Sequence, residues 1–194
     1  MSSCYWVFRF VFYVFFKLFN RLQVFNEEKV PTEGGVIVMS NHASYLDPLL
    51  IGASLRRRAT FMARKGLFKV PLLGSFVSAF SFPVSRTKPL PSTIKEAVKR
   101  LKRGELIVMF PQGSRSMSGD LVDMKRGVSV IARLSGADVV PAFIEGTDKA
   151  LPIGARIPKP SKIRVKFGEP ISIAEYSDED ISSRIVKEMK GLKP

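Results

Sequence analysis

Short apolar runs alternate with amphipathic segments along most of this chain. Two continuous apolar runs, at residues 35–39 and 105–110, predict buried strands. Shorter runs predict further strands at 60–62, 82–84, 138–144 and 162–168. Helical periodicity and capping residues predict helices at 47–55, 66–79 with an interruption near Pro71, 92–103, 125–134 and from residue 177 onward. Strands that alternate with helices predict an α/β fold, in which a central, mostly parallel or mixed sheet is flanked by helices.

The most apolar segment of the chain, residues 5–19, lies at its N-terminus. Arg9 and Lys17 interrupt it, and it is shorter than the roughly 20 residues that a membrane span requires. It also lacks the small-residue cleavage site of a signal peptide, so a removed leader is not expected.

This segment has two different faces at about 100° per residue. The polar residues recur along one stripe, which contains Arg9, Tyr13, Lys17 and Asn20. The opposite face is apolar and contains Val7, Val11, Val14, Phe15, Leu18 and Leu22. We therefore predict a membrane-associated helix: an amphipathic anchoring segment over residues 1–25 that lies in the membrane interface, with its charges among headgroups, followed by a single α/β domain over 26–194. A helix that packs on the protein's own core is the alternative.

Composition and charge narrow the possible functions. The chain has 194 residues, 45% hydrophobic and 25% charged, which is typical of one globular domain. Its 31 basic and 17 acidic residues give a formal net charge of +14, so an anionic partner is expected: nucleic acid, an anionic bilayer or a phosphorylated substrate. One cysteine, Cys4, excludes an internal disulfide framework. One histidine and one cysteine cannot build a nitrogen and sulfur metal site, so no metal is predicted.

The single histidine, His42, lies directly after the first predicted buried strand and five residues before Asp47. Pro48 suits the first turn of a helix, which places His42 in a strand-to-helix turn and Asp47 at the helix start. A carboxylate at that position can orient the imidazole and stabilise its protonated form, so the pair can act as a general base. Two alternatives remain: Asp47 is only a helix N-cap, or the hydroxyl of Ser40 or Ser44 is a covalent nucleophile.

Four blocks of residues resemble the conserved motifs of the glycerolipid acyltransferases. They follow in the family's order: Asn41-His42 with Asp47, Phe82–Arg86, Phe110–Ser116 and Val139–Ile144. The resemblance implies direct transfer of an acyl group, with His42 and Asp47 as the catalytic pair and no cofactor. The third block departs from the family's usual Phe-Pro-Glu-Gly-Thr-Arg-Ser, because Gln112 stands where the family has glutamate.

The resemblance also implies substrate-binding residues. Arg86 and Arg115 would hold a phosphate through the planar guanidinium fork. Gly113 would let backbone N–H groups approach that anion, and Ser114 would add a hydroxyl donor. Gln112 keeps the shape of glutamate and a carbonyl acceptor but cannot ionise, so we expect it to position a substrate by hydrogen bonding. Pro141 is expected to shape a strand end near the acyl site.

The expected activity is transfer of a fatty acyl group from acyl-CoA or acyl carrier protein to the sn-2 hydroxyl of lysophosphatidic acid, giving phosphatidic acid. The expected location is the cytoplasmic face of the cell membrane, in contact with anionic lipids. Within the same class, the acceptor could instead be glycerol 3-phosphate or another lysophospholipid. The alternative outside the class is a basic lipid- or nucleic-acid-binding module. No helix-turn-helix, zinc-finger or aromatic RNA-binding signature occurs in the sequence, so a nucleic-acid partner is not predicted.

Overall fold

A computed structural model describes residues 2–69, 73–84, 91–110, 127–173 and 178–193. The strands are β1 (Gln23–Phe25), β2 (Val36–Ser40), β3 (Ala59–Arg64), β4 (Ser81–Val84), β5 (Leu106–Met109), β6 (Asp138–Glu145) and β7 (Arg164–Phe167). The helices are α1 (Ser2–Phe19), α2 (Asp47–Ser54), α3 (Leu73–Phe80), α4 (Pro91–Lys102), α5 (Gly127–Ser135), α6 (Thr147–Ala150) and α7 (Asp178–Gly191), with 3₁₀ turns η1 (Glu27–Lys29) and η2 (Lys65–Lys69).

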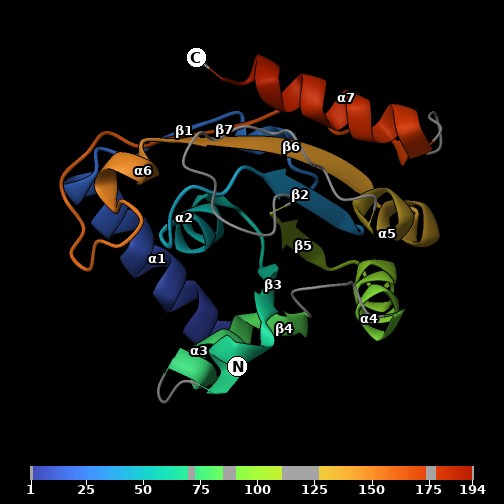
Figure 1. The fold of residues 1–194 in the computed structure, drawn as a ribbon, viewed down its shortest axis with the longest axis horizontal. Coiled ribbons are helices and arrows are strands. Elements are labelled where there is room, and N and C mark those ends of the chain that lie inside the picture. The colour runs from blue at the N-terminus through green and yellow to red at the C-terminus, as the bar shows by residue number, and fades with distance from the viewer. Residues whose placement is uncertain (1, 70–72, 85–90, 111–126, 174–177, 194) are drawn as a thin grey trace.

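The strands form one sheet in the order β1-β7-β6-β2-β5-β3-β4, with helices on both of its faces (Figure 1). Five of the neighbouring pairs are parallel, and β6 with β7 is antiparallel, so the sheet is mixed but mostly parallel, as predicted. Consequently β2, β3, β4, β5 and β6 all end at the same edge of the sheet. Ligands of open α/β sheets bind outside such carboxyl ends.

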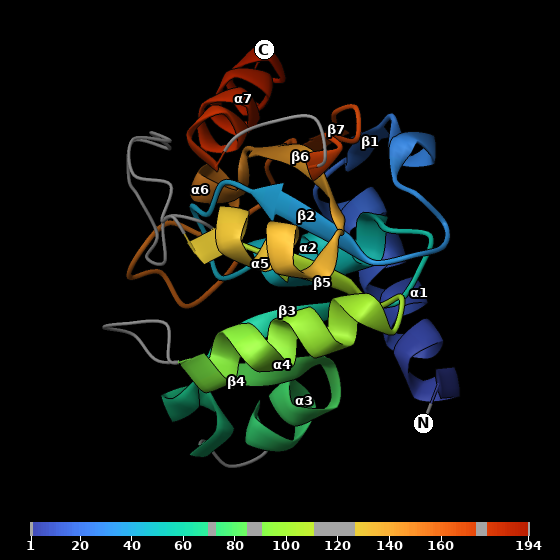
Figure 2. The ribbon, with the colours of Figure 1, turned by 90° about the vertical axis from the view of Figure 1, so that its right-hand side faces the viewer.

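Strand β2 lies in the middle of the sheet and is buried on both faces, which accounts for its continuous apolar sequence. Successive side chains of a strand point to opposite faces. Val36 and Val38 therefore enter one hydrophobic core and Ile37 and Met39 enter the other. Residues of α1 and α2 complete the first core, and residues of α4, α5 and α7 complete the second. In Figure 2, α4 and α5 stand on the side of the sheet nearer the viewer.

Most of the predicted elements are present, with small shifts at their ends. The apolar stretch predicted as a broken helix at 66–79 is the 3₁₀ turn η2 followed by α3, and residues 70–72 between them lie outside the described residues. Gly104 follows α4, and its φ of +81° is left-handed, a conformation that suits glycine after a helix. The short elements β1, η1 and α6 were not predicted.

Helix α1 ends earlier than the predicted segment 1–25. It stops at Phe19, and Gln23–Phe25 forms strand β1, which pairs in parallel with β7 at the edge of the sheet. Arg21 adopts a left-handed φ of +49°, which redirects the chain between the two elements. Residues 23–25 are therefore part of the α/β sheet and not of a helical anchor.

Arg9 and Asn20 of the polar stripe of α1 face the protein, in contrast to the prediction that the stripe lies among headgroups, whereas Lys17 is exposed. Arg9 donates from Nε to the Leu55 carbonyl at 2.6 Å, and Asn20 is buried and donates to the Lys159 and Ser161 carbonyls at 3.2 Å. Tyr5 is buried on the same face, where its hydroxyl accepts a hydrogen bond from the Ala59 N–H at 3.0 Å. Burial raises the pKa of the Tyr5 phenol.

The apolar face of α1 points away from the domain. Leu18 is 78% exposed and Phe10 is 65% exposed, whereas Phe16, on the inner face, is 1% exposed. The exposed large apolar side chains of this helix are Trp6, Val7, Phe8, Phe10, Val11, Phe15, Leu18 and Phe19. None of the helices in the described ranges is long and apolar enough to cross a bilayer. An apolar surface of this extent on one helix marks a site of association rather than a water-facing surface.

Candidate active site

The sequence after β2 folds into a tight turn whose centre is the Asp47 carboxylate. Asp47 is the first residue of α2 and its side chain is fully buried. Its Oδ2 accepts three hydrogen bonds, from His42 Nδ1 at 2.8 Å, the Ala43 N–H at 2.7 Å and the Ser44 N–H at 2.8 Å. The carboxylate therefore binds groups that precede it in the chain. The N-cap position of α2 is occupied by Leu46, and Asp47 is the first residue of the helix, so the alternative that Asp47 is only an N-cap is wrong.

The hydrogen bond to Asp47 determines which ring nitrogen of a neutral His42 carries the proton. A carboxylate oxygen can only accept hydrogen bonds, so Nδ1 carries the proton of a neutral imidazole. Nε2 then holds the lone pair that can remove a proton from a hydroxyl group. The His42 side chain is 19% exposed, so it is reachable from outside, while its partner carboxylate is screened from water. The predicted pairing of His42 with Asp47 is thus present in the described turn.

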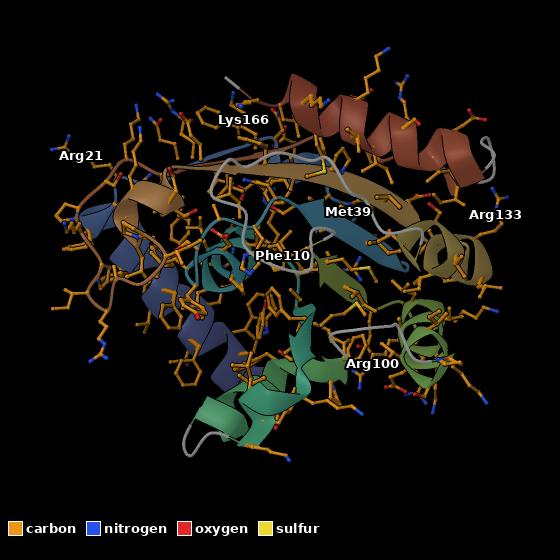
Figure 3. The ribbon with its side chains drawn as sticks, in the orientation of Figure 1. Arg21, Met39, Arg100, Phe110, Arg133 and Lys166 are labelled. Atoms are coloured by element: carbon orange, nitrogen blue, oxygen red, sulfur yellow. The ribbon has the colours of Figure 1, made fainter. Side chains whose placement is uncertain are left out.

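The ring of Phe110 stacks on the imidazole of His42. The ring centroids are 4.4 Å apart and the planes are inclined by 27°. Phe110 directly follows β5, whose carboxyl end lies beside that of β2, and Figure 3 labels Phe110 next to α2. Phe110 was predicted as part of the third motif, without a role of its own. Its face-on position fixes the plane of the imidazole and shields one face of the ring from water.

Asn41 holds the turn against β6. Its Nδ2 donates to the Ile144 carbonyl at 2.8 Å, and its Oδ1 accepts from the Ile144 N–H at 2.7 Å. The last paired residues of β2 and β6 are Ser40 and Ala142. The Asn41 side chain therefore continues the hydrogen bonding to β6 where the main chain of β2 leaves the sheet. This role of Asn41 was not predicted. A polar side chain at the end of a buried strand, immediately before the only histidine, was the available signal.

Neither serine of the turn is placed as a nucleophile. Ser44 is fully buried, and its hydroxyl donates to the Leu151 carbonyl at 2.9 Å while accepting from the Leu46 N–H at 3.3 Å. Ser40 is also fully buried. The hydroxyl of Ser44 therefore braces the turn against residue 151, and the covalent alternative has no exposed serine in this turn.

The other predicted site residues lie outside the described residues, with one exception. Arg86, Gln112, Gly113, Ser114 and Arg115 fall within 85–90 and 111–126, so their roles stay predictions. Pro141, predicted at a strand end, lies instead within β6, where it is buried and paired with Met39 of β2.

A family profile described as "Acyltransferase" matches residues 21–145, which include the turn, the sheet from β1 to β6 and the intervening helices. The chain belongs to the acyltransferase family. The matched region contains His42, Asp47 and Phe110.

Individual acyltransferases extend this similarity over nearly the whole chain. The 1-acyl-sn-glycerol-3-phosphate acyltransferase of Bacillus subtilis (strain 168) is 32% identical over 181 residues, which cover 92% of this chain and 88% of that protein. The chloroplastic 1-acyl-sn-glycerol-3-phosphate acyltransferase LPAT1 of Arabidopsis thaliana is 30% identical over 178 residues, covering 88% of this chain and 50% of that protein.

A solved acyltransferase has the same fold. The crystal structure of the 1-acyl-sn-glycerophosphate acyltransferase PlsC from Thermotoga maritima matches with a TM-score of 0.83 and 25% sequence identity. The match covers 98% of this chain and 80% of that one, so the arrangement of sheet and helices is common to both acyltransferases.

Proposed function

We propose that the protein transfers a fatty acyl group from a thioester donor, acyl-CoA or acyl carrier protein, to the sn-2 hydroxyl of lysophosphatidic acid. The product is phosphatidic acid. The observation that carries this proposal is the His42–Asp47 pair, oriented at 2.8 Å and placed at the carboxyl edge of the sheet. The names of the Bacillus and Arabidopsis relatives support lysophosphatidic acid as the acceptor.

His42 acts as a general base in this reaction. Nε2 removes the proton from the acceptor hydroxyl as its oxygen attacks the thioester carbonyl carbon. The Asp47 carboxylate stabilises the imidazolium that forms, through the bond to Nδ1. Collapse of the tetrahedral intermediate breaks the carbon–sulfur bond, and the proton passes from His42 to the departing thiolate. The step moves only a proton and an acyl group, so it requires no redox cofactor.

The phosphate of the acceptor is assigned to Arg86 and Arg115, assisted by backbone N–H groups at Gly113 and the hydroxyl of Ser114. Arginine suits this task because two of its N–H groups can bind two phosphate oxygens together. Gln112 contributes a neutral carbonyl and amide beside this site, and we assign it a positioning role. Its neutrality removes one negative charge that would otherwise repel the phosphate.

We place the protein at the cytoplasmic face of the cell membrane, with α1 lying in the interface and binding anionic lipids. The exposed apolar face of α1 supports this location, because the hydrophobic effect favours burying those side chains in acyl chains. Lys17, an exposed cation of α1, and Arg21 just beyond its end can contact anionic headgroups. An interfacial position brings the site to an acceptor that resides in the bilayer.

The proposal is tested by a donor-by-acceptor matrix with purified protein on phospholipid vesicles. Acyl-CoA and acyl carrier protein are each combined with lysophosphatidic acid, glycerol 3-phosphate or lysophosphatidylcholine, and products are measured by mass spectrometry. We expect phosphatidic acid as the dominant product. Preferred acylation of another acceptor would refute the proposed substrate, and no acyl transfer with any pair would refute the enzymatic function.

A further inference from the structure

Helix α4 carries a row of exposed basic side chains. Lys95, Lys99, Lys102 and, directly after the helix, Arg103 are all exposed, and they recur at intervals of four, three and one residues. These intervals place them on one stripe of the helix surface. The buried residues Thr93, Ala97 and Leu101 occupy the opposite side of the helix and face the second core.

Acidic side chains near this stripe are already bound elsewhere. Arg100 pairs through Nε with Glu96 at 2.7 Å and through Nη1 with Glu105 at 3.2 Å. Its guanidinium also lies 5.2 Å from the ring centre of Phe82, so Arg100 is part of the folded structure and not of the exposed stripe. Figure 3 labels Arg100 at α4. Among the described residues, no carboxylate forms an ion pair with the four stripe residues.

The basic side chains of the stripe repel one another. Like charges four residues apart on a helix repel, as Lys95 does with Lys99 and Lys99 with Arg103. Lys99 and Lys102 lie in the last turn of α4, where a cation interacts favourably with the helix dipole, so the repulsion within the stripe is partly offset. Concentrated, uncompensated charge of one sign creates a field that attracts an oppositely charged partner.

The stripe lies on the opposite side of the sheet from the proposed membrane surface. Helix α1 packs on the core that contains Val36 and Val38, whereas α4 packs on the core that contains Ile37 and Met39. Figures 1 and 2 agree, with α1 and α4 on opposite sides of the central strands. When the apolar face of α1 rests on a bilayer, α4 faces the aqueous side. The partner of the stripe is therefore a soluble anion.

The form of the stripe favours a macromolecule over a small nucleotide. Small molecules bind in concave, largely apolar pockets with a few polar groups. The stripe instead lies along the outer surface of one helix, and Lys95 and Lys102 are about 10 Å apart along the axis at 1.5 Å per residue. Helix α4 connects the parallel strands β4 and β5, so the stripe runs from Lys95, nearer the edge of the sheet where His42 lies, to Arg103, nearer the opposite edge.

We propose that the exposed basic stripe of α4 is the docking site of an acidic acyl carrier protein, which is the acyl donor. The inference rests on the proposed acyl transfer and names the source of its acyl group. The carrier's acidic surface pairs with Lys95, Lys99, Lys102 and Arg103, and its thioester arm reaches the carboxyl edge of the sheet. There the carbon–sulfur bond breaks, the new carbon–oxygen bond forms on the acceptor, and the acceptor's proton ends on the carrier's thiol.

The test compares two donors that carry the same acyl chain, acyl carrier protein and acyl-CoA. The variant combines Lys95→Glu, Lys99→Glu and Lys102→Glu. Its matched control combines Lys187→Glu, Lys190→Glu and Lys193→Glu, which changes the net charge equally at exposed positions of α7 and the residues after it, on the same side of the sheet. All proteins are full-length, and kcat/KM is measured for both donors at low and high salt on the same vesicles.

We expect the α4 variant to lose about 10- to 100-fold in kcat/KM with acyl carrier protein at low salt. The loss should shrink at high salt, because screening weakens charge attraction. With acyl-CoA, the α4 variant should stay within about threefold of the unmodified protein, as should the control variant with either donor. Equal losses with both donors, an equal loss in the control, or no loss would overturn the proposal. If the unmodified protein used acyl-CoA but not acyl carrier protein, the docking site would be wrong and the proposed function would stand. If it used neither donor, both proposals would be wrong.

Discussion

The turn after β2 and helix α1 both bury polar side chains, but α1 also exposes a row of large apolar side chains. The turn buries Asn41, Ser44 and Asp47 and gives each a specific hydrogen-bond partner. Helix α1 also turns its polar groups inward, since Arg9 and Asn20 donate to backbone carbonyls of the domain, but it leaves its apolar face outside. The turn is thus built to hold one imidazole in place, and α1 is built to contact an apolar environment.

The comparison implies that chemistry and membrane binding are separable. Substitutions in the turn should change turnover without changing vesicle binding. Substitutions on the outer face of α1 should change vesicle binding without disturbing the His42 pair. Deleting residues 1–25 is a poor test, because it would also remove β1 and the buried Tyr5 and Phe16.

Asp47→Asn should lower turnover as strongly as any single substitution in the turn. The amide cannot stabilise an imidazolium as a carboxylate does. The amide oxygen can still accept the three hydrogen bonds that now reach Oδ2, so the change removes the charge while keeping the turn. We expect kcat to fall roughly 10²- to 10⁴-fold, with unchanged vesicle flotation. Asp148→Asn, at an exposed acid of α6, is the control and should retain full activity. Comparable kcat in both variants would remove Asp47 from the mechanism.

A second prediction concerns the outer face of α1. The double variant Val11→Asp with Leu18→Asp places two charges where we propose acyl chains lie. Burial of one such side chain is worth roughly 1.5–3 kcal/mol, so vesicle affinity should fall at least about tenfold in a flotation assay. The thermal midpoint of unfolding should change little, because both side chains are exposed.

The matched control for this variant lies on the other side of the sheet. Val130 and Leu134 are exposed apolar residues of α5, so Val130→Asp with Leu134→Asp makes the same chemical change away from the proposed membrane surface. The control should bind vesicles normally. If both double variants lost affinity equally, the orientation of α1 on the bilayer would be wrong.

Among the turn substitutions, Asn41→Ala is expected to have the smallest effect on turnover. It leaves the buried N–H and C=O of Ile144 without their side-chain partners, which should cost about 2–5 kcal/mol in the free energy of unfolding. We also expect kcat to fall about tenfold, because the turn that carries His42 loses its attachment to β6. That loss corresponds to roughly 1.4 kcal/mol in the activation barrier.

Asn20→Ala is the control that separates the loss of stability from the loss of kcat expected for Asn41→Ala. Asn20 is another buried asparagine with two hydrogen bonds to backbone carbonyls, but its partners hold the end of α1. Its loss should lower stability to a similar degree and leave kcat unchanged. Equal kcat values in the two variants would mean that Asn41 has only a structural role.

Local signals in the sequence predicted the sheet and the catalytic pair. The apolar run 36–39 indicated a strand buried on both faces, and the five-residue spacing of His42 and Asp47 closes within one turn. The role of Asn41 was not predictable in this way, because its partner Ile144 is 103 positions away.

The sequence of α1 predicted its two faces but not which face meets the domain. Amphipathic periodicity is the same for a helix whose polar stripe faces water and for one whose polar stripe faces the protein. The decision depends on distant groups, such as the Leu55 and Lys159 carbonyls, that only the folded chain brings to Arg9 and Asn20. Strand β1 was missed for a similar reason, since three residues become a strand only through pairing with β7.

The most direct test of the account is the turnover of purified His42→Ala protein on vesicles containing lysophosphatidic acid. Formation of phosphatidic acid is followed by mass spectrometry, and flotation of the same sample measures vesicle binding. We predict a loss of turnover of about 10²- to 10⁴-fold, with a normal unfolding midpoint and normal binding, because the side chain is partly exposed and carries the proton transfer. Near-normal formation of phosphatidic acid by the folded, vesicle-bound variant would contradict the central claim that His42 is the general base.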